Sequence, residues 1–211
     1  MLEGIEVLYH SSIRMEKEGK VIYFDPYGIK NEPKDADIIF CTHSHYDHFS
    51  EEDILKIKNE DTIIVVTVDL EEKIKKLGFE DNQKLLVLPN KKYSISKIMV
   101  ETVPAYNVNK DFHKREYDWV GYVVTLDDVR YYIAGDTDVN DDNRLVKCDV
   151  AFLPIGGKYT MTATEAAGLA NAIKPKIAVP THYAGIVGEL VNAEEFENML
   201  NANIKCVKYI K

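Results

Sequence analysis

The feature that most constrains this chain is a run of potential metal ligands between positions 43 and 48, which reads His43-Ser44-His45-Tyr46-Asp47-His48. It directly follows Asp37–Thr42, a nearly all-apolar segment that is typical of a buried central strand. Side chains two residues apart on an extended chain point to the same side, so His43 and His45 can bind one ion together. The chain is therefore expected to fold so that a core strand ends in a metal site.

The chemistry of this run favours first-row transition metals and zinc. Imidazole and carboxylate groups suit these ions, whereas calcium and magnesium need more oxygen ligands. The alternative is a set of solvated loop histidines, but half of the six histidines of the chain fall within this run. We expect one or two divalent ions, with zinc as the first choice and manganese, iron or nickel also compatible.

Two further polar residues follow apolar runs in the same way. Arg130–Ala134 continues into Gly135 and Asp136, and Lys176–Pro180 continues into Thr181 and His182. Each residue alone would equally fit a turn aspartate or a buried core histidine. Together with the first run, Asp136 and His182 complete a set of metal ligands at the ends of strands, which is where sheet proteins commonly build their sites.

Short apolar and β-branched runs recur along the whole chain and alternate with helical patterns. The expected strands are Ile5–Tyr9, Lys20–Phe24, Asp37–Thr42, Thr62–Thr67, Leu85–Leu88, Ile98–Val103, Trp119–Leu126, Val129–Ala134, Val150–Pro154, Ile177–Pro180 and Lys205–Ile210. Helices are expected after Ser50, from Asp69 with Gly78 just past the end, after Thr162 with Glu165 as its capping partner, and after Asn192 with Glu195. No linker breaks the pattern, so we expect one α/β domain over residues 1–211, with two sheets packed together and helices outside.

The ligand pattern as a whole resembles the metallo-β-lactamase superfamily of binuclear metallohydrolases, over the chain from Ile5 to Tyr183. This resemblance implies a four-layer αββα sandwich with the metals at one edge of the two sheets. It further implies that the first ion is held by His43 and His45, the second ion by Asp47, His48 and His182, and that Asp136 bridges them.

Other fragments resemble a narrower branch, that of the ascorbate-6-phosphate lactonase and its relatives. They are Tyr9-His10-Ser11-Ser12, Asp25-Pro26 and Gly156-Gly157-Lys158-Tyr159-Thr160-Met161. In this branch Asp25 is expected to accept hydrogen bonds that hold the ligand loop, with a plain turn aspartate as the equal alternative.

One departure from the superfamily pattern concerns the third ligand of the first ion. The superfamily places a histidine after a middle strand, whereas here Val103–Tyr106 is followed by Asn107, and an amide is a poor zinc ligand. The first ion is then expected to be held weakly or to be completed by another residue. His113 is the nearby candidate, and an exposed loop histidine is the preferred alternative for it. His10 offers a second route to the metals from the first strand.

These residues predict a hydrolase that uses a metal-activated water on a small ester, lactone or phosphorylated metabolite. Asp47 or Asp136 can accept the proton of the water, and His10 or His113 can protonate the leaving group. Lys158 and Tyr159, which precede the helix after Thr162, are candidates for contact with an anionic substrate group, and a solvated Lys158 is the preferred alternative. Asn107 is a further candidate for substrate contact.

Two other functions compete with this prediction. The first is a metal-dependent phosphodiesterase or nuclease, which the net charge of −9 disfavours because nucleic acid binding needs clustered Lys and Arg. The second is a di-iron redox protein on the same fold. Di-iron redox proteins of this fold tend to carry Glu at the second position of the ligand pair and to have an attached flavin domain. This chain has His45 at that position and is short, which disfavours the redox function.

The remaining features concern the compartment of the protein. The three cysteines (Cys41, Cys148 and Cys206) are isolated and odd in number, which indicates reduced thiols. The N-terminus carries acids rather than a basic start, and no run is long enough to cross a bilayer. We expect a cytoplasmic protein whose partner is a small-molecule substrate, with no membrane contact.

Overall fold

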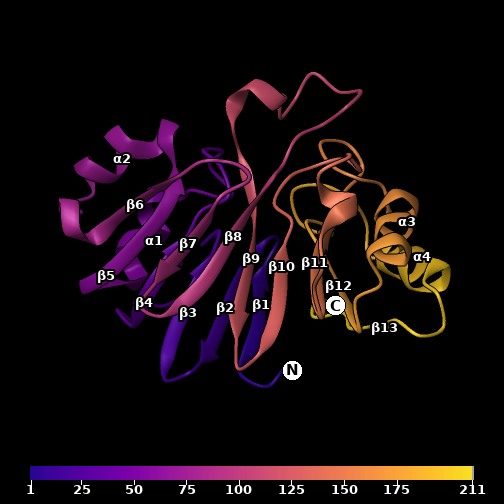
Figure 1. Ribbon diagram of the computed structural model, residues 1–211, viewed down its shortest axis with the longest axis horizontal. Helices are drawn as coiled ribbons and strands as arrows, with labels where there is room; N and C mark the ends of the chain where they lie inside the picture. The colour runs from indigo at the N-terminus through magenta and orange to yellow at the C-terminus, as the bar shows by residue number, and fades with distance from the viewer. Residues whose placement is uncertain (211) are drawn as a thin grey trace. The chain divides into compact units, whose positions relative to one another are not determined.

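Two β-sheets organise residues 1–210, the part of the chain that the computed structural model describes, and each sheet belongs to its own unit. The N-terminal unit spans Leu2–Leu88, and the C-terminal unit contains Met1 and the chain from Pro89 onward. Each unit combines its sheet with two α-helices (Figure 1). This composition confirms the predicted α/β class, whereas the prediction of one domain over the whole chain stays a prediction.

The sheet of the N-terminal unit has six strands in the order of the sequence. They are β1 (Ile5–Tyr9), β2 (Ser12–Lys17), β3 (Lys20–Phe24), β4 (Ala36–Phe40), β5 (Lys58–Thr67) and β6 (Lys84–Val87). The strands β1, β2 and β3 pair antiparallel, and every later step from β3 to β6 is parallel. The strands β3 and β4 therefore end at the same edge of the sheet, and this edge carries the candidate ligands.

The helices α1 (Glu51–Ile57) and α2 (Glu71–Lys76) pack on this sheet through one apolar cluster. Ile54 from α1 and Ile74 from α2 lie in the cluster with Ile39 and Ile64 from the strands, and all four are fully buried. The predicted start of α1 is confirmed, because the Ser50 side chain accepts a hydrogen bond from the backbone of the first turn at 3.2 Å.

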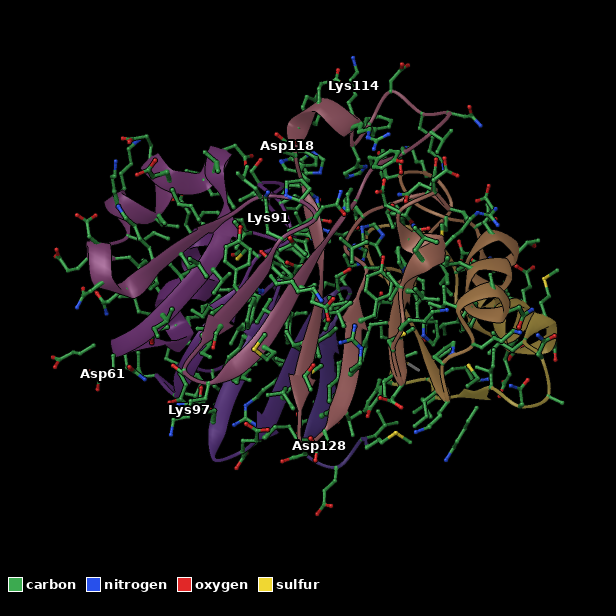
Figure 2. All side chains as sticks on the ribbon, in the orientation of Figure 1. Asp61, Lys91, Lys97, Lys114, Asp118 and Asp128 are labelled. Carbon is green, nitrogen blue, oxygen red and sulfur yellow. The ribbon has the colours of Figure 1, made fainter. Side chains whose placement is uncertain are left out.

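The sheet of the C-terminal unit has seven strands and also keeps the order of the sequence. They are β7 (Lys92–Ile95), β8 (Ile98–Pro104), β9 (Val120–Leu126), β10 (Val129–Ile133), β11 (Val150–Pro154), β12 (Ile177–Thr181) and β13 (Lys205–Cys206). Pairing is antiparallel from β7 to β10 and parallel from β10 to β13. The hairpin between β9 and β10 turns at Asp127 and Asp128, which both have positive φ angles (Asp128 is labelled in Figure 2).

The helices of the C-terminal unit are α3 (Ala163–Ile173) and α4 (Val191–Met199). The capping box of Thr162 and Glu165 is confirmed. The prediction that Asn192 caps α4 is wrong, since the cap is Leu190 and Asn192 lies inside the first turn. Its side-chain oxygen accepts a hydrogen bond from Glu189 N at 2.7 Å, an amide that precedes the helix, so Asn192 stabilises the turn before α4 and does not cap it.

Other boundaries also differ from the sequence prediction. The strands β2 and β7 were not predicted. In β2 charged residues interrupt the apolar pattern, since Ile13 and Met15 are buried while Arg14 and Glu16 are not, and β7 has only four residues. Short 3-10 turns supplement the helices: η1 (Val68–Leu70), η2 (Asp81–Gln83), η3 (Arg115–Tyr117) and η4 (Asn143–Leu145). Among residues 1–210, none of the helices has the length and apolar character that crossing a membrane would need.

Candidate metal centre

The candidate ligands follow the carboxyl ends of strands in both units. In the N-terminal unit Asp25 comes directly after β3, and His43 comes three residues after the end of β4. In the C-terminal unit Asp136 follows β10 at the same spacing, and His182 comes directly after β12. Polar side chains at the carboxyl edge of a parallel sheet can converge because neighbouring strands end there together.

Asp25 is the hub of the N-terminal set and is fully buried. Its Oδ1 accepts a hydrogen bond from Thr42 N at 2.7 Å, and its Oδ2 accepts from Thr42 Oγ1 at 2.8 Å. The same Oδ2 lies 2.7 Å from His48 Nδ1. A carboxylate oxygen only accepts, so His48 must carry its proton on Nδ1 and present the lone pair of Nε2. The expectation that Asp25 supports the ligand loop agrees with this geometry.

Thr42 determines which ring nitrogen of a second histidine, His43, carries the proton. Its hydroxyl donates its one proton to Asp25, so it can only accept from His43 Nδ1, which lies 3.0 Å away. His43 is therefore also protonated on Nδ1 and presents Nε2. No role was predicted for Thr42, although its place between the buried strand and His43 is a usable signal in the sequence.

The remaining ligands of the N-terminal unit lie around these two rings. His43 Nε2 is 3.1 Å from His45 Nδ1. Asp47 Oδ2 is 3.5 Å from His48 Nε2 and 3.4 Å from His10 Nε2. His10 directly follows β1, is fully buried and has a positive φ angle of 54°.

In the C-terminal unit two histidines face the same carboxylate oxygen of Asp136. Asp136 Oδ2 lies 3.2 Å from His113 Nε2 and 3.1 Å from His182 Nε2. All three residues are at least 96% buried. The interpretation of His113 as an exposed loop histidine is therefore wrong.

The burial of His113 results from contacts of its loop with distant segments. Asn107 N donates to His113 O at 2.8 Å, and Asn107 Nδ2 donates to Tyr159 O at 2.7 Å. Lys110 donates to Thr160 O at 3.0 Å and forms an ion pair with Asp138. Asn107 therefore holds the loop that carries His113. In this loop His113 lies next to the Asp136 carboxylate, which in the superfamily pattern a histidine at position 107 would approach.

The separations between ligand atoms fit metal binding. Within each unit they range from 3.1 to 3.5 Å. Two ligands of one tetrahedral ion, each at roughly 2.0–2.2 Å from it, lie about 3.3–3.6 Å apart. The donor set of imidazoles and carboxylates also matches zinc and first-row metals. The side chains that could hold metal are His10, His43, His45, Asp47 and His48 in the N-terminal unit, and His113, Asp136 and His182 in the C-terminal unit.

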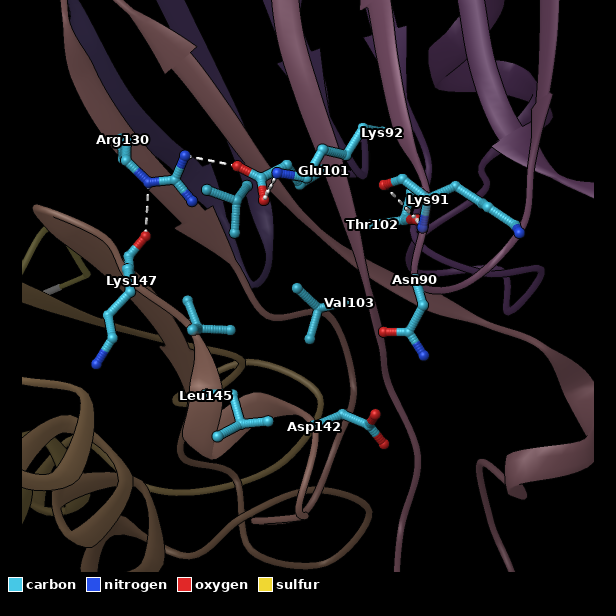
Figure 3. A pocket seen from close by; sticks show the side chains of 12 residues that line it. Asn90, Lys91, Lys92, Glu101, Thr102, Val103, Arg130, Asp142, Leu145 and Lys147 are labelled. Atoms are coloured by element: carbon cyan, nitrogen blue, oxygen red, sulfur yellow. Dashed lines mark hydrogen bonds and ion pairs between the residues drawn. The ribbon is translucent and has the colours of Figure 1, made fainter.

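Other side chains fit this chemistry less well. Burial raises the pKa of the Cys41 thiol well above its usual value, and the charge of Asp25 adds to this effect, so Cys41 is a packed thiol and a poor ligand. Lys158 is exposed and lies over the Tyr159 ring at 5.0 Å. A cavity of about 310 Å³ in the C-terminal unit is lined by Arg130, Glu101 and Lys147 among others, and no predicted site residue lines it (Figure 3).

Comparison with known proteins identifies the family. A family model described as beta-lactamase superfamily domain matches residues 4–182. The chain belongs to this superfamily.

Relatives within the superfamily match nearly the whole chain. The UPF0173 metal-dependent hydrolase of Pyrococcus horikoshii is 31% identical over 96% of this chain and 94% of its own length. A protein from Parabacteroides distasonis, described as a metal-dependent hydrolase, is 31% identical in a solved structure with a TM-score of 0.81, covering 98% of this chain and 93% of that one.

A more distant solved structure shares the fold alone. CmlA, a diiron β-hydroxylase from Streptomyces venezuelae, is 14% identical with a TM-score of 0.76, and the match covers 97% of this chain and 52% of CmlA. The fold therefore occurs both in metal-dependent hydrolases and in a diiron β-hydroxylase, and the chemistry of this chain must be argued from its own residues.

Proposed function

We propose that this chain, a metal-dependent hydrolase of the β-lactamase superfamily, acts on a small ester, lactone or phosphorylated metabolite. The relatives that match its full length are named metal-dependent hydrolases, which supports the general activity. The observation that carries the proposal is the hydrogen-bond network of Asp25 and Thr42, because it fixes both His43 and His48 in the tautomer that a metal ligand needs.

The ligands of the two units are proposed to hold two divalent ions together. We assign one ion to His43, His45 and His113, the last in place of the superfamily histidine that Asn107 replaces. The other ion is assigned to Asp47, His48 and His182, with Asp136 shared. Zinc is the first choice, and manganese, iron and nickel are compatible with the same donors. Bound ions of this kind supply Lewis acidity and lower the pKa of water, so that water can attack at neutral pH.

The residues of the chain then move protons and orient the reacting groups. Asp136 is placed to accept a proton, because its Oδ2 already faces two imidazole nitrogens and is buried from bulk water. His10 Nε2 lies 3.4 Å from Asp47 Oδ2 and can return a proton to the leaving group. Exclusion of water around these groups strengthens their electrostatic effect on the reacting centre.

The proposed substrate is a small molecule rather than a nucleic acid. A net charge of −9 disfavours binding of a long phosphate backbone, which requires clustered cations. A phosphodiester substrate and an iron-dependent redox reaction remain the competing activities, and one experiment separates all three.

The experiment is metal analysis of the purified protein, followed by assays with zinc or manganese on lactones, thioesters, phosphate monoesters and phosphodiesters. We expect one or two ions per chain and hydrolysis within the lactone, ester or monoester group. Activity confined to phosphodiesters would identify the nuclease alternative. Bound iron with oxygen consumption and no hydrolysis would identify the redox alternative.

A further inference from the structure

Three tyrosines form a cluster beside the ligands of the N-terminal unit. Tyr9 ends β1, Tyr27 lies two residues after Asp25, and Tyr46 lies between His45 and Asp47. Three segments that each carry a residue of the candidate metal centre therefore each contribute one tyrosine. We call Tyr9, Tyr27 and Tyr46 the tyrosine cluster.

The rings of the cluster contact one another in a row. The centroids of Tyr9 and Tyr27 lie 5.8 Å apart with a tilt of 37°, and those of Tyr27 and Tyr46 lie 5.8 Å apart with the rings at 77°. Both arrangements fall in the range of favourable aromatic pairs. Because neighbouring rings touch, no ligand fits between them, and the cluster offers its outer surface instead.

This surface is exposed although the ligands next to it are buried. Tyr46 is 63% exposed and Tyr9 is 39% exposed, whereas Asp47 is 7% exposed and His10 is fully buried. The partial burial of Tyr27 raises the pKa of its phenol, and the negative charge of Asp47 adds to this effect.

The backbone makes room for this arrangement at one position. Gly28 has a φ angle of +71°, and a Cβ atom there would lie 2.9 Å from Cδ1 of Tyr9. The ring of Tyr9 therefore packs directly on the glycine backbone. Gly28 N in turn donates to Asp53 Oδ2 at 2.9 Å, which ties this turn to α1. The ring of Tyr9, at one end of the cluster, is thus packed against a turn that is anchored to α1.

We infer that the tyrosine cluster binds the apolar ring-bearing part of the substrate, while the bond to be cleaved faces the adjacent metal ligands. This inference rests on the proposed function and specifies its substrate class: an ester, thioester or lactone that carries an aromatic or similarly flat apolar group. A row of aromatic rings, half-buried at Tyr27 and exposed at Tyr9 and Tyr46, adjoins buried polar ligands. This matches the usual division of a small-molecule site into an apolar wall and a few polar groups. Stacking on an exposed ring is favourable because a flat apolar group covers much of the ring at low entropic cost.

The test compares the binding of two carboxylates that differ only in a ring, phenylacetate and acetate. Both resemble the acid product of ester hydrolysis, and their dissociation constants are measured by calorimetry on the metal-loaded protein. We expect phenylacetate to bind at least about tenfold more tightly than acetate. The variant Y46A should reduce this preference to within about threefold, whereas Y46F should retain it because the ring remains.

Two controls keep the result interpretable. The affinity for acetate should be the same in all variants, which shows that the neighbouring ligands are intact. The variant L55A removes a side chain of 45% exposure from α1 in the same unit and should leave the preference unchanged. An unchanged preference in the double variant Y9A/Y46A would overturn the inference.

Failure of this inference differs from failure of the proposed function. The protein could hydrolyse phenylacetyl and acetyl esters with equal kcat/KM values that Y46A does not change. This result would overturn the role of the cluster and leave the hydrolase intact. A phenylacetate preference that depends on Tyr46, in a protein that hydrolyses none of the panel, would support the cluster and overturn the hydrolase.

Discussion

At the scale of single residues, one buried carboxylate sets the chemistry of two imidazoles. Asp25 accepts from Thr42 and His48, and through the Thr42 hydroxyl it also determines which nitrogen of His43 carries a proton. A ligand histidine in the wrong tautomer points an N–H at the metal instead of a lone pair. Replacing Asp25 is therefore expected to weaken metal binding more than it weakens the packing of the protein.

The substitution Asp25→Asn tests this role. The amide places a donor opposite His48 Nδ1 and Thr42 Oγ1, so we expect metal affinity to fall about 10–100-fold in competition titrations with a chelating dye. Asp35→Asn is the matched control, because Asp35 also accepts hydrogen bonds in the N-terminal unit, from Arg14 and Tyr23. Equal loss of affinity in both variants would show a general effect on stability rather than a specific effect on the ligands.

Asp136 is the second residue with a decisive prediction. Its carboxylate faces both His113 and His182, so Asp136→Ala removes the group proposed to be shared between the ions. We expect hydrolysis of any accepted substrate to fall by orders of magnitude with the fold retained, measured as kcat/KM and as the far-ultraviolet circular dichroism spectrum. The control variant Asp142→Ala removes an ion pair with the exposed Arg115 in the same unit, and this variant should retain the activity of the parent. Activity of Asp136→Ala within a few-fold of the parent would exclude a shared ligand.

At the scale of elements, two glycines of the C-terminal unit have opposite roles. Gly121 lies in β9, where a Cβ atom would be 2.6 Å from Ala134 O and 2.7 Å from Ile133 O. These backbone oxygens lie at the end of β10, two to three residues before Asp136. Gly168 lies inside α3, and its Cβ would meet nothing within 4 Å.

The two alanine substitutions should therefore change stability in opposite directions. Gly121→Ala forces β9 and β10 apart and should lower the free energy of unfolding by about 1–3 kcal/mol. Gly168→Ala improves helix propensity and should raise it by about 0.5–1 kcal/mol. Denaturant titrations followed by circular dichroism measure both. A neutral Gly121→Ala would mean that the end of β10 is more adaptable than its close packing indicates.

At the scale of the whole molecule, the proposed metal ligands come from both units, and this has a thermodynamic consequence. Metal that binds only the folded protein stabilises it by about 2.7 kcal/mol at a free concentration one hundred times the dissociation constant. Trp119 is the single tryptophan and belongs to the C-terminal unit, so its fluorescence reports the unfolding of that unit. We expect added zinc to raise the unfolding midpoint at Trp119 and a chelator to lower it.

The variant His43→Ala turns this shift into a test of ligand convergence. His43 belongs to the N-terminal unit, yet its loss should remove much of the zinc-induced shift seen at Trp119. A full shift in His43→Ala would show that the C-terminal ligands bind metal alone. A structure with bound metal would complete the test, with ligand atoms of both units expected roughly 2.0–2.3 Å from the ions.

The sequence predicted those parts of the molecule that local pattern determines. The strands before His43, Asp136 and His182 were found because each is a continuous apolar run that ends in a polar residue, and α1 and α3 were found from their caps. The burial of His113 could not be predicted, since no strand precedes it and its position depends on contacts of Asn107 and Lys110 with residues about fifty positions away. The tyrosine cluster likewise depends on three separate segments, which no local pattern connects.

The order of the strands has a consequence for how the protein is made. In the N-terminal sheet every strand pairs with its immediate neighbour in the sequence, so no strand has to wait for a partner from the distant end of the chain. Loop closure between consecutive strands is fast compared with pairing across long separations. The sheet from β1 to β6 can thus assemble on the ribosome once Leu88 has left the exit tunnel, and it presents His43, His45, Asp47 and His48 to the cell before Asp136 and His182 have been translated.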